Sequence, residues 1–109
     1  MEDKKYAFYS YGRTKEFSDY YFLQNFWYSL EELALAPNDC LFFNDVGNSL
    51  KQKELMFSML ANIKCIVIPS YDHLNPSRTL FKELYEDRIH REGIYIICLD
   101  EEGYWRECI

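Results

Sequence analysis

Short runs of apolar residues alternate along the chain with longer stretches in which apolar residues recur every three or four positions. Runs rich in β-branched and aromatic residues are typical of strands, and the longer spacing is typical of helices. The predicted strands are Lys5–Tyr11, Cys40–Phe43, Cys65–Ile68, Ile94–Leu99 and a short edge strand over Tyr104–Ile109. Because strands and helices alternate, the pattern predicts an α/β fold. The predicted fold has three layers: a doubly wound, mostly parallel sheet of four or five strands, with helices on both of its faces.

The first predicted helix carries apolar residues on more than one side. Ser18 or Asp19 is expected to cap it, and it is expected to run to about Leu35. Aromatic residues such as Tyr20 and Tyr28 lie off its main apolar face, so an exposed apolar patch is expected there. The residues predicted to be buried are Phe22, Leu23, Phe26, Trp27, Leu30 and Leu33.

Capping signals mark the other two helices. Ser49 followed by Gln52 resembles a capping box, and Asn75 followed by Pro76 predicts another helix start. Gly93 is expected to end that third helix. The residues that the third helix is expected to bury are Leu80, Phe81, Leu84, Tyr85 and Ile89.

The loop after the predicted central strand is the first candidate for a functional site. Cys65–Ile68 is an unbroken apolar run of the kind found in strands covered on both faces, and Pro69 ends it. Asp72 and His73 therefore lie just past the carboxyl end of a central strand, where α/β sheets bind ligands.

Composition and charge narrow the function classes. The chain has 109 residues, enough for one domain, and 18 acidic against 12 basic residues, for a net charge of −6. This balance argues against nucleic-acid binding. The four cysteines are expected to be reduced thiols of a cytoplasmic protein, because none forms a C-x-x-C pair, and no metal or cofactor is expected. No targeting segment or membrane-spanning run is evident.

Several motifs appear in an order that resembles a known family. Tyr11–Lys15 reads Y-G-R-T-K, and Gln24 follows nine residues after Lys15. Phe43–Asn48, Asp72–Pro76 and Gly93–Leu99 come next in the chain. Together these segments resemble the N-terminal catalytic domain of serine recombinases, the resolvases and invertases.

The resemblance implies a degenerate site at Arg13, Lys15, Asp72 and His73. Arg13 and Asp72 match family positions. Lys15 stands where the family has its nucleophilic serine, and His73 and Pro76 stand where it has arginines. On this basis no catalytic residue is expected, and the chain is expected not to be an enzyme.

The resemblance also implies a function. The expectation is a single resolvase-like domain over 1–109, without a C-terminal DNA-binding domain. It is expected to act as a pseudoenzyme that binds a protein partner, or itself, in DNA recombination by a mobile element. The alternative is a small-anion or nucleotide-binding protein that uses the strand ends around Arg13 and Asp72. Residual DNA binding through the same basic residues is a third class, and the acidic charge argues against it.

Overall fold

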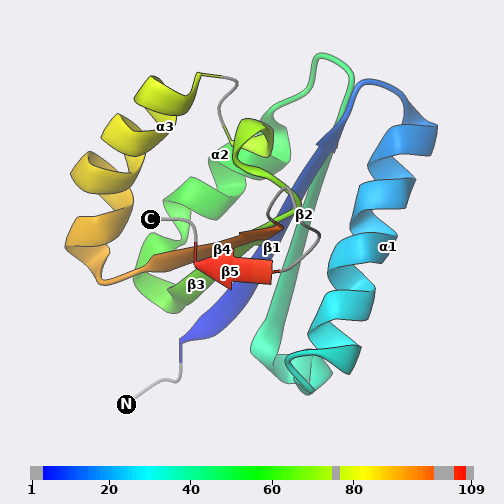
Figure 1. Cartoon of the computed structure of the whole chain (residues 1–109), viewed down its shortest axis with the longest axis horizontal. Helices are drawn as coiled ribbons and strands as arrows, with labels where there is room; N and C mark the ends of the chain where they lie inside the picture. The colour runs from blue at the N-terminus through cyan, green and yellow to red at the C-terminus, as the bar shows by residue number, and fades with distance from the viewer. Residues whose placement is uncertain (1–3, 75–76, 100–104, 108–109) are drawn as a thin grey trace.

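The computed structural model describes residues 4–74, 77–99 and 105–107, and Figure 1 shows their arrangement. Five strands form one sheet in the order β2-β1-β3-β4-β5. The first four pair in parallel, and β5 is antiparallel to β4. The strands are β1 Lys5–Gly12, β2 Cys40–Val46, β3 Ile63–Ile68, β4 Tyr95–Leu99 and β5 Trp105–Glu107. The predicted mostly parallel α/β sheet is confirmed.

Helices cover both faces of the sheet. Helix α1 lies on one face, and α2 and α3 lie on the other (Figure 1). Helix α3 continues as a wider π-helical turn over Tyr85–Ile89 and then as a tighter 3-10 turn over His90–Glu92. Gly93 ends this helical segment in the left-handed conformation, with φ 74°. The helices are α1 Lys15–Glu31, α2 Lys51–Ser58 and α3 Arg78–Leu84, with 3-10 turns at Pro37–Asp39, Leu60–Asn62 and Tyr71–His73.

The core consists of two clusters separated by the sheet. The smaller cluster lies under α1 and contains Phe8, Tyr28, Cys65 and Val67. The larger cluster lies under α2 and α3 and draws on all four parallel strands. Phe81 of α3 and Tyr85 and Ile89 of the π-turn that follows belong to this cluster, as predicted. Leu80 was predicted to be buried but is exposed, because it lies on the solvent side of α3.

A buried carboxylate joins three elements on the α2 side. Asp45 is the penultimate residue of β2, and its side chain accepts the backbone N–H groups of Gln52 at 3.0 Å and Lys53 at 2.9 Å. The Tyr9 hydroxyl of β1 donates to the same carboxylate at 2.9 Å. A carboxylate at a helix N-terminus satisfies free N–H groups and opposes the positive end of the helix dipole. Asp45 therefore fixes where α2 begins relative to the sheet.

This contact explains why the predicted capping box is wrong. Leu50 is the N-cap residue of α2, and the hydroxyl of Ser49 accepts only a long bond, 3.4 Å, from the N–H of Lys51. The free N–H groups are satisfied from β2 instead. Strand β2 accordingly extends to Val46, three residues beyond the predicted end of this strand at Phe43.

The starts of the other helices also differ from the prediction. Helix α1 begins at Lys15, and the Thr14 hydroxyl caps it by accepting the Phe17 N–H at 3.4 Å. Ser18, the predicted cap, is buried inside the helix. Ser77 caps α3 through the N–H of Leu80 at 3.3 Å. The predicted cap residues 75 and 76 lie outside the described residues.

Helix α1 packs on the sheet through a face that the sequence did not predict. The residues that it buries are Ser18, Asn25, Tyr28 and Ser29. Leu23 and Trp27, both predicted to be buried, are 52% and 55% exposed, and Phe26 and Leu30 are exposed as well. The predicted exposed apolar patch is therefore present, but on the side of α1 that was assigned to the core.

Hydrogen bonds account for this orientation. The Ser18 hydroxyl lies 2.7 Å from Oδ1 of Asn44 and 3.2 Å from the carbonyl oxygen of Asp45. The Asn25 amide donates to the carbonyl oxygen of Tyr9 at 3.1 Å. Gly12 lets the helix come this close, because a Cβ there would lie 2.1 Å from the Ser18 nitrogen. Polar and small residues thus attach α1 to β1 and β2.

Candidate functional site

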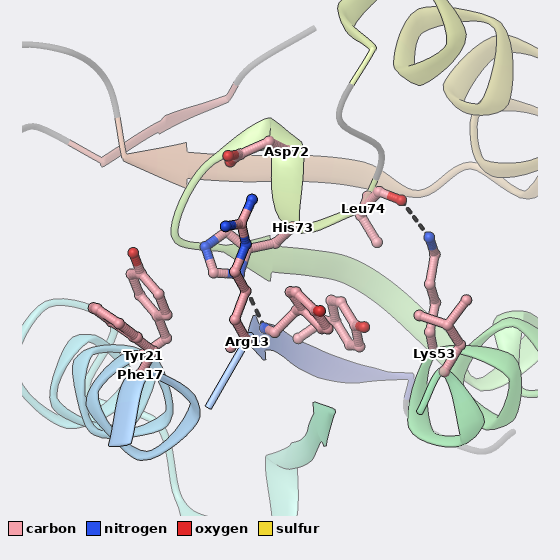
Figure 2. A pocket seen from close by; sticks show the side chains of 11 residues that line it. Arg13, Phe17, Tyr21, Lys53, Asp72, His73 and Leu74 are labelled. Atoms are coloured by element: carbon pink, nitrogen blue, oxygen red, sulfur yellow. Dashed lines mark hydrogen bonds between the residues drawn. The ribbon is translucent and has the colours of Figure 1, made fainter. Parts of the chain in front are cut away.

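A pocket of about 600 Å³ opens at the carboxyl ends of β1 and β3, which are neighbours in the sheet. Figure 2 shows Phe17 and Tyr21 of α1 on one side of the pocket and Lys53 of α2 on the other. Arg13 and His73 lie between them. The pocket therefore spans the edge of the sheet between its two helical layers, at the place where parallel α/β sheets bind ligands.

His73 is held in the pocket wall by two contacts. Its ring Nδ1 accepts the backbone N–H of Tyr11 at 3.0 Å, and its ring packs against Tyr21 edge-to-face, with centroids 4.5 Å apart. Burial lowers the pKa of His73 to about 4, although the nearby charge of Asp72 acts in the opposite direction. His73 is therefore neutral at pH 7, and the bond from Tyr11 places its proton on Nε2.

Arg13 supplies the free positive charge of the site. It lies in the turn between β1 and α1, where its side chain is exposed and lines the pocket. No hydrogen bond or ion pair engages its guanidinium within the described ranges. The N-terminus of α1 begins two residues later, so the positive end of the helix dipole lies on the same side.

Lys53 and Asp72 complete the charged lining. The Lys53 ammonium donates to the carbonyl oxygen of Leu74, and burial lowers the pKa of Lys53, an effect that the Asp45 carboxylate opposes. The Asp72 carboxylate accepts the hydroxyl of Ser70. The site thus holds cationic donors together with one carboxylate, an arrangement that can bind an anion or position a polar ligand.

Three of the four residues expected from the sequence line this pocket: Arg13, Asp72 and His73. Lys15 does not. Its side chain is exposed on α1 and forms an ion pair with Asp19 at 2.8 Å. Sequence reasoning missed Lys53, Tyr11 and Tyr21. Tyr11 lies at the end of β1 itself, whereas only the packing of α1 and α2 brings Tyr21 and Lys53 to the strand ends, so no local pattern could have identified those two.

The described part of the chain contains no helix long and apolar enough to cross a membrane. Nor does it contain a group of three or more His, Cys, Asp or Glu side chains that could hold a metal ion.

Comparison with known proteins assigns the fold. The structure is similar to the crystal structure of the N-terminal catalytic domain of TP901-1 integrase, with a TM-score of 0.69. The match covers 94% of this chain and 81% of that chain at 19% sequence identity. No family model matches the sequence. No curated protein matches it either. The predicted resemblance to a serine recombinase catalytic domain is therefore confirmed for the fold.

The prediction that the chain is not an enzyme is wrong. The fold that it shares is that of a catalytic domain, which contradicts the prediction. The argument for inactivity depended on Lys15 occupying the place of a nucleophile and on His73 and Pro76 occupying the places of arginines. Because Lys15 does not line the pocket and pairs with Asp19 instead, its identity does not show which chemistry the pocket supports.

The environment of His73 predicts a measurable pH dependence. Its pKa falls from 6.5 in the unfolded chain to about 4 in the folded one. The neutral form therefore stabilises the fold fully above pH 6.5, and this contribution is lost as the pH falls from 6.5 toward 4. The ring resonances of His73, followed by NMR, should titrate with a midpoint near 4. Between pH 7 and 4.5 the wild type should lose about 2 kcal/mol more unfolding free energy than His73→Gln.

His90→Gln, a change of the same kind at an exposed position, controls for the loss of a histidine as such. A midpoint near 6.5 for His73 in the native protein would contradict both its burial and its bond to Tyr11.

Proposed function

We propose that residues 1–109 form a single resolvase-like domain that acts by binding a partner protein through the outer side of α1. The recombinase-like fold supports a role in modulating DNA recombination, such as that of a mobile element. The observation that carries the proposal is the exposed apolar side of α1, which the fold itself does not use.

The outer stripe, defined as Tyr20, Leu23, Trp27 and Leu30, runs along three turns of α1. Its spacing of three, four and three residues is that of a helix that packs against another element. Tyr20 is 60% exposed, so the stripe is not covered by the rest of the described chain. Helix α1 therefore has two packing faces, of which the polar one is already occupied by the sheet.

The composition of the outer stripe fits protein recognition. Tryptophan and tyrosine are enriched among the residues that contribute most to binding between proteins. Monomeric proteins rarely expose a contiguous apolar patch of this kind without a function. Phe17 and Phe26 lie at the edges of the stripe and are also exposed, which widens the apolar surface.

Site-specific photocrosslinking in the native cell tests this proposal. A photoreactive phenylalanine analogue at Leu23 is expected to give one discrete adduct with a second protein, because the outer stripe contacts the partner directly. The same analogue at Leu80, which is 51% exposed on α3, is the matched control and should give no such adduct.

The adduct at Leu23 should disappear when Trp27→Glu is added, and its mass shows whether the partner is a second copy of the chain. A recombinase or another component of the same element in the adduct would support the recombination role. Adducts of equal yield at Leu23 and Leu80, or none at Leu23, would refute the proposal.

A second function is favoured by the free guanidinium of Arg13 in the pocket. Together with the N-terminus of α1, it is placed to bind a phosphate group. Saturating phosphate, compared with chloride at equal ionic strength, should raise the melting temperature by roughly 4–8 °C for each 1 kcal/mol of binding. Arg13→Gln should abolish this rise, whereas Arg91→Gln, on the exposed surface, should keep it. A rise that persists in Arg13→Gln would exclude this site.

A further inference from the structure

A second hollow of about 510 Å³ lies between the outer side of α1 and β5. We call it the α1–β5 groove. Four aromatic residues line it, Tyr20, Trp27, Tyr28 and Trp105, together with Glu31 and Glu32. Tyr20 and Trp27 also belong to the outer stripe, so the groove continues the apolar surface described above. It lies outside the strand-end pocket, with which it shares no residue.

The aromatic walls of the groove favour a cation. Tyr28 and Trp105 stack with centroids 4.1 Å apart and their planes inclined by 22°. Trp27 is 55% exposed beside them. The faces of aromatic rings carry partial negative charge and attract ammonium and guanidinium groups, most strongly on tryptophan.

The charge at this end of α1 favours a cation as well. Glu31 is the last residue of α1 and Glu32 is its C-cap, and the last turn contains no basic residue. Both carboxylates therefore lie at the negative end of the helix dipole, where acidic groups destabilise a helix. Neither forms an ion pair within the residues described here. A bound cation would relieve this repulsion.

An amide oxygen adds a third feature. The Oε1 atom of Gln24, which lines the groove, is buried and has no hydrogen-bond partner among the described residues. A buried acceptor without a donor is unfavourable, because it has lost its hydrogen bonds to water. Lysine and arginine side chains carry only donors, so either can supply the missing hydrogen bond once the Gln24 side chain turns its amide toward the groove.

We infer that the α1–β5 groove binds a lysine or arginine side chain of the partner protein. This inference rests on the proposed function, because the same partner covers the outer stripe. Its contact segment is an amphipathic helix whose apolar residues pack on Leu23 and Trp27 and whose basic residue enters the groove. Charge complementarity selects this occupant over a second copy of the chain, since the chain carries a net charge of −6.

The groove contains both tryptophans of the chain, so intrinsic fluorescence reports on it directly. The probe is a synthetic helix of about 20 residues, above the length at which isolated helices are marginal, with leucines at helical spacing and flanking lysines. A matched peptide carries glutamine in place of each lysine. Neither contains an aromatic residue. The lysine peptide should change the tryptophan emission and bind roughly 10-fold more tightly than the glutamine peptide at low salt.

A double variant tests the role of the groove. Glu31→Gln with Glu32→Gln should remove the preference for the lysine peptide. Glu54→Gln with Glu83→Gln removes the same charge from exposed positions on α2 and α3 and should keep the preference. Equal binding of both peptides, abolished by Leu23→Asp, would overturn the cation site while leaving the proposed function of the outer stripe intact.

A preference that survives in the Glu31→Gln, Glu32→Gln variant, or no binding of the lysine peptide, would also overturn the inference. Sedimentation of the chain alone measures self-association. A dimer that excludes the lysine peptide would show that a second copy occupies the surface instead.

Discussion

Helix α1 is attached to the sheet by buried hydrogen bonds, and the rest of the arrangement depends on this attachment. Ser18 bonds to Asn44 and Asp45, and Asn25 bonds to Tyr9. Each such bond contributes only about 1 kcal/mol, but turning α1 around its axis would remove the donors from the acceptors of β1 and β2 and leave those acceptors under apolar side chains, at a larger cost. The polar side of α1 must therefore face the sheet. Its large apolar residues remain outside as a consequence.

The same junction shapes the strand-end pocket. Strand β1 reaches α1 through Gly12, where the helix backbone comes too close to allow a side chain. Immediately before it, the N–H of Tyr11 is left to bond His73, and immediately after it Arg13 enters the pocket. On the opposite side, Asp45 holds the start of α2 and so positions Lys53. One short region of β1 and β2 thus places both walls of the pocket and the orientation of α1.

The sequence predicted the features that depend on local pattern. The unbroken apolar run of β3, the alternation of strands and helices, and the position of Asp72 and His73 at a strand end could all be read directly. The motif order also identified the recombinase-like fold. These features could be predicted because the burial of a strand and the order of the elements determine which apolar and polar residues follow one another along the chain.

The failures share a physical cause. Periodicity shows that α1 has apolar faces, but it does not show which face packs on the sheet. Here hydrogen bonds hold the polar face against the sheet, and Leu23 and Trp27 are left exposed. The cap of α2 comes from Asp45 on a strand rather than from a neighbouring serine. Inactivity was inferred from Lys15, His73 and Pro76, and of these the side chain of Lys15 lies outside the pocket. For α1 and for the cap of α2, the deciding contact joins residues whose meeting no local pattern reveals.

The central claim is that α1 presents its polar side to the sheet and its apolar side to a partner. Urea unfolding of two variants at adjacent aromatic positions tests it most directly. Trp27→Gln should change the free energy of unfolding by less than about 1 kcal/mol, because the side chain is half exposed. Tyr28→Gln should cost roughly 3 kcal/mol, because Tyr28 is buried against Trp105. Equal destabilisation by the two substitutions, or a larger effect at Trp27, would contradict the account.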